Sequence, residues 1–264
     1  MGPQALNMLD NTTVHDCQML VLKGMSEHPL SAAVVWSVTR GSFDHEATLS
    51  GLLDKVSFVS DDSSARCIFQ IALSATALLN LGIPEAAIHA CGRSFTSGMP
   101  TPRLPRALGD GDPEKWPWSD QRGSLLWLLY ARSEGALEEG LSELERVRQR
   151  AGLEKPQVLR TSLPEDGREP FGFRDGVTNI TPRVPEKGGE PPKWVHKVAP
   201  GDVILGRQDA FDITTDFGWL GNGGSFLVAR QIEQDVEGFW SYWLDQAGGD
   251  HQKQMWLAAK AMGR

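Results

Sequence analysis

The sequence lacks the features that mark a membrane protein, a secreted protein or a nucleic-acid-binding protein. It has no run of eighteen apolar residues, so no segment is predicted to span a bilayer. Residues 1–11 contain no basic region followed by an apolar segment, so no secretory signal is predicted and a cytoplasmic location is expected. The net charge of -8 and the pI near 5.3 argue against a broad nucleic-acid footprint or a polybasic membrane patch.

Cysteine is scarce, and the common metal and phosphate motifs are missing. The 3 cysteines, Cys17, Cys67 and Cys91, are widely spaced and form no Cys-x-x-Cys pair. Reduced thiols in a reducing compartment are therefore expected. No His/Cys/Asp/Glu group has the spacing of a zinc site, and no Gly-x-x-x-x-Gly-Lys-Ser/Thr loop is present. These patterns do not predict a zinc site or a P-loop nucleotide site.

The apolar segments predict an α+β protein. With 264 residues, of which 40% are hydrophobic, the chain can bury the core of one large domain or two smaller ones. Its apolar, β-branched runs predict strands at Leu30–Val38, Arg66–Leu73, Ser124–Ala131 and Gln157–Leu163. Helical spacing and capping residues predict helices at Asp44–Lys55, at Ser74–Leu81, around residues 137–147, from Gln231 and from Gln252. Residues 95–118 and 182–192, which are rich in proline or glycine, are predicted to be loops.

The order of these elements before Pro164 indicates a ferredoxin-like unit. A strand, a helix and a strand are followed by a second strand, helix and strand. Apolar strands of this kind need a layer of helices on one face of their sheet. Residues 1–164 are therefore predicted to form one domain.

The stretch from Glu169 to Asn179 carries the most specific pattern in the chain. It contains Gly172-x-x-Asp175-Gly176, with Phe171 and Phe173 just upstream. Its proline and glycines predict a loop in which a carboxylate lies between two flexible positions. Asp-Gly is also a common turn dipeptide, so an ordinary turn is the alternative reading of this motif by itself.

The longer pattern resembles the Gly-x-x-Asp-Gly signature of the dye-decolourising (DyP-type) peroxidases, a family of haem peroxidases. Three other stretches are similar to that family in the same order along the chain. They are Phe95–Asp110, with Phe-x-x-Gly-Met and Leu-Gly-Asp; Val198–Gly206; and Asn222–Arg230, where the family has a strand. The resemblance covers nearly the whole chain. It implies two ferredoxin-like domains of the dimeric α/β-barrel type with antiparallel sheets, residues 1–164 and 165–264, the first complete and the second incomplete.

The resemblance also implies a chemistry. The family reduces hydrogen peroxide and oxidises dyes or phenols with haem b, so peroxide and an organic reductant are the expected partners, and a homo-oligomer is possible. Asp175 matches the distal acid that moves the peroxide proton, and an ionised aspartate can accept one near neutral pH. Phe173, Asp175, Gly176, Val177 and Thr178 are the expected cofactor-binding residues. The positions of the axial histidine and the distal arginine fall beyond Arg264, so no residue is assigned as a metal ligand.

Three other residues invite a functional reading but have ordinary alternatives. His196 and His251 lack the family's surroundings for an axial ligand, and are expected to be solvated or capping residues. Arg230 follows an apolar run and is expected to play a structural part, pairing with an acid such as Glu233.

Two readings compete with an incomplete peroxidase. One is a haem-free α+β module for oligomerisation or binding, with the tryptophan-rich residues 219–256 as its partner surface. The other is one half of a split peroxidase. Because the second domain would lack strands that complete its sheet, self-association is expected.

Overall fold

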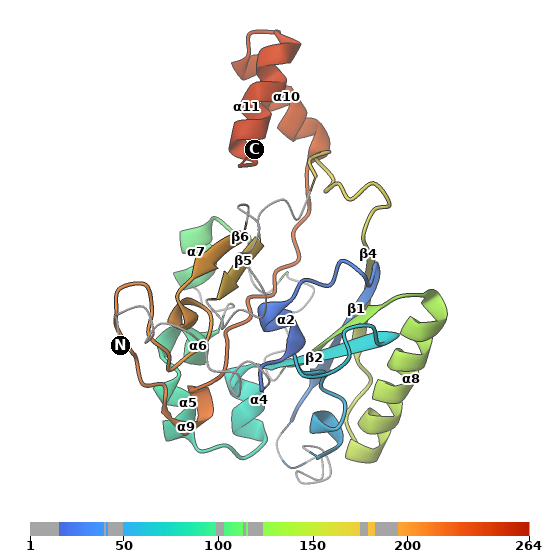
Figure 1. The fold of residues 1–264 in the computed structure, drawn as a ribbon, viewed down its shortest axis with the longest axis vertical. Helices are drawn as coiled ribbons and strands as arrows, with labels where there is room; N and C mark the ends of the chain where they lie inside the picture. The colour runs from blue at the N-terminus through green and yellow to red at the C-terminus, as the bar shows by residue number, and fades with distance from the viewer. Residues whose placement is uncertain are drawn as a thin grey trace, which may run out of the picture.

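The computed structural model describes residues 16–39, 41, 50–98, 103–112, 115, 124–174, 179–182 and 195–263. Its centre is an antiparallel four-stranded sheet in the order β2-β3-β1-β4 (Figure 1). The strands are β1 (Leu30–Ser37), β2 (Cys67–Leu73), β3 (Ser124–Ala131) and β4 (Gln157–Ser162). The four predicted strands and the ferredoxin-like fold class are confirmed, because this order is that of a β-α-β-β-α-β unit with the first strand beside the third and fourth.

Helix α8 (Glu134–Ala151) covers one face of the sheet (Figure 1). Its first turn is capped by the Ser133 hydroxyl, which accepts a hydrogen bond from the Ala136 N–H. Its end is set by Gly152, whose φ of 69° is a left-handed conformation that glycine adopts without strain. Residues 50–53 are helical, while the earlier part of the predicted helix Asp44–Lys55 lies outside the described residues.

The core lies between α8 and the sheet. Along β3, buried residues alternate with partly exposed ones, so that Leu125, Trp127 and Leu129 all face the helix. Trp127 is 0% exposed and lies edge-on to Trp36 of β1, with ring centroids 5.9 Å apart. Trp36 and Trp127 therefore anchor the core.

The backbone groups on the outer edge of β2 pair with Gln18 and Ser57, and no described strand lies along this edge. The Gln18 amide donates to the Ile71 carbonyl (2.9 Å) and accepts from the Ile71 N–H (2.7 Å). Ser57 pairs with Phe69 through its backbone N–H (2.8 Å) and its hydroxyl (3.0 Å). These bonds occupy backbone groups that an exposed edge would present to another chain.

The long connection between β2 and β3 is more helical than predicted. Helix α4 (Ala75–Asn80) agrees with the predicted Ser74–Leu81, and α5 (Glu85–Ala90) and α6 (Arg93–Ser97) follow it. The loop prediction for residues 95–118 was wrong at residues 95–97, the end of α6, and at α7 (Arg103–Leu108). Pro105 lies in the first turn of α7, where backbone N–H groups have no partner within the helix, so its missing N–H costs little there.

The chain after β4 contains short strands and two exposed helices. Strands β5 (Asn179–Pro182) and β6 (Val195–Val198) pair in parallel, and η3 (Pro200–Asp202) and α9 (Gly218–Gly221) follow. Helices α10 (Val236–Gln246) and α11 (His251–Ala261) project from the rest of the molecule in Figure 1. Helix α2 (Met19–Leu22) completes the described elements. The predicted loop at 182–192 lies almost wholly outside the described residues.

Two expectations for this part need correction. The helix predicted from Gln231 begins only after Asp235, whose carboxylate caps it by accepting the Gly238 N–H at 2.8 Å. The strand expected at Asn222–Arg230 is wrong, because residues 224–235 form neither helix nor strand. Phe226, Leu227 and Val228 have strand-forming side chains, but none joins a ladder with another described segment, and a strand exists only when it is paired.

Candidate functional site

The segment that carries the Gly-x-x-Asp-Gly pattern begins with a tight turn, Arg168–Arg174, called the signature turn below. The Glu169 carboxylate lies inside it and accepts the N–H groups of Phe171 and Phe173, both at 2.8 Å. The Glu169 N–H donates to the Phe173 carbonyl at 2.9 Å, and the Gly172 N–H donates to the Glu169 carbonyl at 2.8 Å. Gly172 has a φ of 94°, which glycine adopts without steric cost. One half-buried acid, Glu169, therefore fixes the backbone just before Asp175.

Two aromatic contacts hold this turn against α10. Phe171 stacks on Phe239 with ring centroids 4.2 Å apart, and Phe173 stacks on Trp240 at 5.8 Å. The Gln234 amide also donates to Glu169, at 3.3 Å. Offset stacking of this kind contributes roughly 0.5–1.5 kcal/mol per pair beyond the buried area. The turn and the start of α10 consequently form one packed unit.

The sequence-predicted site residues divide between described and undescribed positions. Phe173 is half-buried against α10. Asp175, Gly176, Val177 and Thr178 lie outside the described residues, so their assignment stays a prediction. Glu169 was not predicted as part of the site. Its signal in the sequence was an acid two residues before an aromatic residue and three before a glycine.

Arg230 is paired, but with a different acid from the one expected. Its guanidinium contacts the Asp110 carboxylate in an ion pair whose two side chains are 35% and 19% exposed. The pair joins the Leu-Gly-Asp segment to the extended residues after Gly224. Phe95 and Phe226 pack nearby at 5.7 Å, so the structural role expected for Arg230 is supported and the proposed pairing with Glu233 is replaced.

Among the histidines with described side chains, none has the setting of an iron ligand. His28 is 3% exposed and its Nε2 lies 2.9 Å from the Ala65 carbonyl oxygen. His251 lies at the start of α11, with Nδ1 3.0 Å from the Gln254 side chain, and His89 lies 3.4 Å from Glu85 on the surface. His196 is in β6, and its side chain is not described.

The cysteines offer no better ligand for a haem iron. Burial raises the pKa of the Cys67 thiol to about 12, and it also raises the pKa of Cys17 and Cys91. These thiols stay protonated near neutral pH, and a thiolate is the form that binds metal. Within the described residues, no group of three or more His, Cys, Asp or Glu side chains could hold a metal ion. The described side chains therefore do not by themselves provide a fitting ligand for a haem iron.

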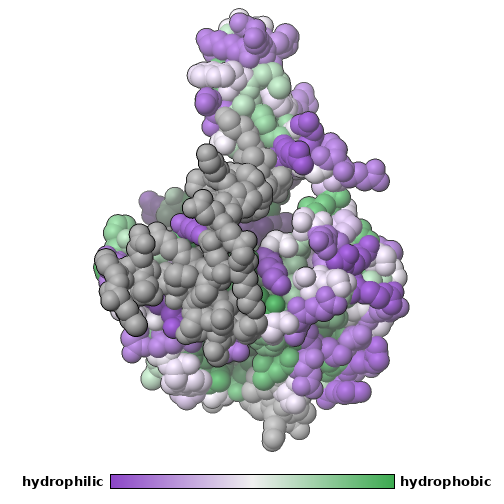
Figure 2. Space-filling model, in the orientation of Figure 1, coloured by the Kyte–Doolittle hydropathy of each residue, from purple (hydrophilic) through white to green (hydrophobic). Residues whose placement is uncertain are grey.

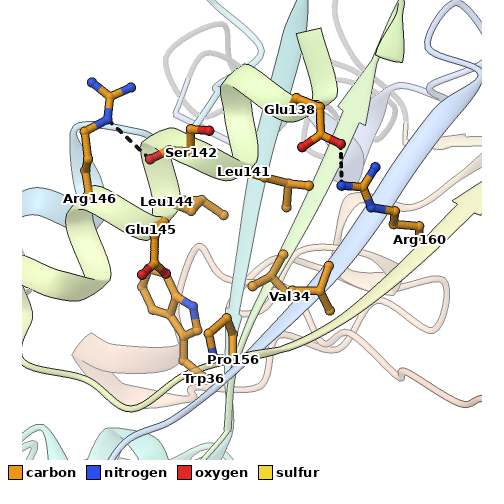
Figure 3. A pocket seen from close by; sticks show the side chains of 11 residues that line it. Val34, Trp36, Glu138, Leu141, Ser142, Leu144, Glu145, Arg146, Pro156 and Arg160 are labelled. Atoms are coloured by element: carbon orange, nitrogen blue, oxygen red, sulfur yellow. Dashed lines mark hydrogen bonds and ion pairs between the residues drawn. The ribbon is translucent and has the colours of Figure 1, made fainter. Parts of the chain in front are cut away.

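A groove of about 580 Å³ lies between α8 and the strands β1 and β4 (Figure 3). Val34, Trp36 and Leu141 form its apolar lining. Its charged side chains already have partners, because Glu138 binds Arg160 at 2.5 Å and Glu145 binds Arg148 at 2.6 Å. Arg146 likewise donates to the Ser142 carbonyl at 3.3 Å, so the charged groups of this groove are engaged on its walls and it is not a candidate catalytic site.

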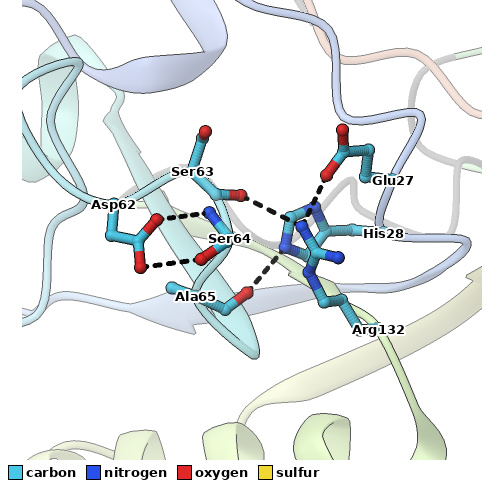
Figure 4. Close-up of polar contacts among 7 residues, drawn as sticks. All are labelled: Glu27, His28, Asp62, Ser63, Ser64, Ala65 and Arg132. Atoms are coloured by element: carbon cyan, nitrogen blue, oxygen red, sulfur yellow. Dashed lines mark hydrogen bonds and ion pairs between the residues drawn. The ribbon is translucent and has the colours of Figure 1, made fainter.

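A second polar cluster, around His28, has a structural role (Figure 4). Glu27 binds the Arg132 guanidinium at 2.5 Å, and Arg132 also reaches the Ser63 carbonyl at 3.5 Å. Asp62 accepts the N–H and hydroxyl of Ser64 at 2.8 and 2.7 Å. These bonds tie the loop before β2 to the start of β1 and the end of β3.

Solved structures identify the fold. A fungal DyP-type peroxidase from Auricularia auricula-judae matches with a TM-score of 0.73 at 22% identity, covering 94% of this chain and 54% of that chain. The chain has the fold of the dye-decolourising peroxidases. A dye-decolorizing peroxidase in complex with 2,6-dimethoxyphenol matches with a TM-score of 0.71 at 21% identity, covering 89% and 53% of the two chains.

A third matching structure is an engineered peroxidase. It is a dye-decolorizing peroxidase whose heme pocket was engineered for asymmetric sulfoxidation, and it matches with a TM-score of 0.72 at 22% identity over 91% and 53% of the two chains. The present chain thus spans about half the length of the peroxidases that it matches. A scan of family models and a search of curated proteins found no match. No helix in the described residues is both long and apolar enough to cross a membrane.

Proposed function

We propose that this chain is part of a DyP-type peroxidase, which reduces hydrogen peroxide while it oxidises a dye or phenol. The observation that carries the proposal is the peroxidase fold over about nine-tenths of the chain, with the Gly172-x-x-Asp175-Gly176 pattern in the same chain. The proposed cofactor is haem b, which would supply the redox chemistry when bound. Since the chain spans about half of those peroxidases, the activity of the whole enzyme is part of the proposal.

Asp175 is the proposed proton-transfer residue. An aspartate carboxylate with its usual pKa is ionised at neutral pH. It can take a proton from one oxygen of hydrogen peroxide and return it to the other oxygen, which leaves as water. The organic reductant supplies two electrons, and with two protons these reduce the remaining oxygen to a second water. Positioned proton transfer of this type contributes about 100-fold to 10,000-fold to a rate.

The signature turn supports this role by fixing the backbone that leads into Asp175. Its acid, Glu169, is held by two backbone N–H groups, and its two phenylalanines are stacked on α10. A general acid or base works only when its geometry is fixed within hydrogen-bond reach of the proton. The anchored segment runs up to Arg174, which directly precedes the proposed catalytic residue Asp175 in the sequence.

A haem titration followed by a peroxide-dependent dye assay tests the proposal. It is run on this chain and on the chain joined to the C-terminal half of a DyP-type peroxidase. We expect weak haem binding and negligible turnover by the chain alone, because its described residues include no iron ligand, and turnover by the joined protein. In that protein Asp175→Asn should lower turnover about tenfold to ten-thousandfold.

Asp245→Asn is the matched control, since Asp245 is an exposed aspartate on α10 and its loss should leave turnover unchanged. Full turnover by the Asp175→Asn protein would show that the role of Asp175 is wrong. A histidine-ligated haem spectrum from the chain alone would show that it carries its own ligand and would direct attention to His196 and His251.

A further inference from the structure

Gln254 of α11 is the one buried polar side chain among the described residues after Pro164, at 9% exposed. Its amide nitrogen donates to the Trp240 carbonyl of α10 at 2.8 Å, and its amide oxygen lies 3.0 Å from His251 Nδ1. Because the nitrogen faces a carbonyl, the oxygen accepts from His251, and Nδ1 carries the proton. Both polar atoms of this amide therefore have partners, as a buried amide requires.

The local sequence places Gln254 opposite α10. Gly248 and Gly249 have φ values of 66° and 83°, which glycine adopts without strain, and they reverse the chain between the two helices. Asp250 then caps α11 by accepting two backbone N–H groups, at 2.9 and 3.1 Å. Gln254 and Ala258, four residues apart on one face of α11, are its two buried residues, and α11 packs on α10.

Trp240 links this bond to the signature turn. Its carbonyl accepts from Gln254, while its ring stacks on Phe173 with centroids 5.8 Å apart. Phe173 is two residues before Asp175 in the sequence. A continuous series of contacts thus runs from α11 through α10 to the backbone that enters the proposed catalytic residue.

The orientation of α10 depends on few described contacts. Figure 1 shows α10 and α11 side by side, projecting from the rest of the molecule. Figure 2 shows hydrophobic and hydrophilic residues mixed on this projection. Among the described elements, α10 packs most extensively on α11. The described contacts that set its orientation are therefore those with α11 and with the signature turn, and both lie within one chain.

We propose that Gln254 is a positioning residue for the site, because its bond to Trp240 sets how α10 presents its aromatic rings to the signature turn. The inference rests on the proposed function, in which Asp175 transfers the peroxide proton. A hydrogen bond has a narrow range of length and angle, so this one restricts how far α10 and α11 can slide past each other. Without it, the turn and the backbone entering Asp175 can shift, and a misplacement of about 1 Å can cost about a hundredfold in rate.

Hydrogen exchange at the Phe171 and Phe173 amides tests this link in the chain alone, because the Glu169 carboxylate accepts both N–H groups. Gln254→Glu keeps the size of the side chain but replaces its donor with an oxygen, and two acceptors cannot share a hydrogen bond with the Trp240 carbonyl. We expect protection of the two amides to fall about fivefold to a hundredfold, the range for a buried acceptor left without its donor.

Gln252→Glu is the matched control, because Gln252 is exposed on the same helix and the change of charge is the same. It should leave the protection of the turn unchanged. Circular dichroism checks that α10 and α11 stay helical in both proteins. Unchanged protection in the Gln254→Glu protein, or an equal loss in the Gln252→Glu protein, would overturn the inference.

Two substitutions of Trp240 decide the question if the Gln254→Glu helices unfold. Trp240→Phe keeps both the backbone carbonyl and a ring that can stack on Phe173, so protection should remain. Trp240→Ala keeps the carbonyl but loses the stack, so protection should fall about as far as in the Gln254→Glu protein. Equal protection in the two Trp240 variants would show that α10 does not hold the turn.

Turnover by the chain joined to the C-terminal half of a DyP-type peroxidase separates positioning from simple stabilisation. Gln254→Glu should lower kcat about tenfold to a hundredfold and leave the KM for the dye unchanged. A kcat equal to that of the Gln252→Glu protein would show that Gln254 only stabilises the helices. A joined protein that is inactive before any substitution would count against the proposed function instead, and hydrogen exchange in the chain alone would still decide whether Gln254 holds the turn.

Discussion

Side chains in the four-stranded sheet are buried to a very different extent from those in the chain after Pro164. Trp36, Trp127, Leu129 and Leu144 are all 0–1% exposed between the sheet and α8. Helix α10 has no buried residue, and the buried apolar residues described after Pro164 are Ala199, Ile204, Ala247 and Ala258. The later region still contains large apolar side chains, including Trp219 at 70% and Val228 at 66% exposed. The contrast shows that apolar composition alone does not produce a core, because a core also needs elements that face one another.

The two regions differ in the partners of their backbone N–H and C=O groups. In the sheet, every strand pairs with a neighbour, and one face is covered by a helix whose capping residues lie at both ends. After Pro164, side-chain carboxylates fix the loop backbone at several places, since Glu169, Asp202 and Asp209 each accept backbone N–H groups. Such bonds fix local shape, but they bury little apolar area.

The largest expected effect is on the sheet core. Trp127→Ala should lower the free energy of unfolding by about 3–5 kcal/mol, because a fully buried aromatic side chain leaves a cavity that its neighbours cannot fill. Phe239→Ala in α10 should change global stability much less, and instead free the signature turn. Chemical denaturation measures the first effect, and hydrogen exchange at Phe171 and Phe173 measures the second. Equal losses of global stability for the two variants would contradict the division between the regions.

A pair of glycine substitutions in α8 should give opposite results. A Cβ at Gly140 would lie 2.8 Å from the Cys67 Sγ and 3.2 Å from a Leu129 methyl group, whereas nothing lies within 4 Å of a Cβ at Gly135. Gly140→Ala is expected to destabilise by about 1–3 kcal/mol through overpacking. Gly135→Ala should stabilise by up to about 1 kcal/mol through helix propensity. Thermal unfolding of the two variants measures both signs, and stabilisation by Gly140→Ala would show that the core is looser than its geometry indicates.

The smallest expected effect concerns a surface ion pair. The Arg148 guanidinium, through its hydrogen bonds, lowers the pKa of Glu145 to about 2. Because the folded-state pKa is lower than the unfolded one, the stabilisation is fully present above about pH 4.5 and is lost as pH falls toward 2. Glu145→Gln should therefore unfold more easily than the unmodified chain at pH 7, by no more than about 1 kcal/mol, and this difference should vanish near pH 2. A difference that persists at pH 2 would assign the effect to packing instead of charge.

The chain after Pro164 has fewer paired strands among its described residues than the sheet before it. The described residues after Pro164 provide one parallel pair of strands, the 3-10 helix η3 and the helices α9, α10 and α11, while the domain boundaries at 1–164 and 165–264 stay a prediction. The likeness in fold to peroxidases of nearly twice this length agrees with a first unit that is complete and a second that is partial.

The sequence by itself determined the sheet, because its signals are local. The alternation of β3, the helical spacing of α8 with Gly152 at its end, and the short run of β4 each depend on residues that are neighbours in the chain. Helical spacing and capping residues also predicted α11, which begins at His251, one residue before the expected Gln252. These elements meet because the apolar face of each is specified by its own period of two or 3.6 residues.

The conformation of residues 224–232 and the partner of Arg230 were decided only by the tertiary structure. Residues 224–232 have the side chains of a strand, but pairing depends on a partner elsewhere in space, and no described segment provides one. The partner of Arg230 proved to be Asp110, 120 residues away, and not the nearby Glu233.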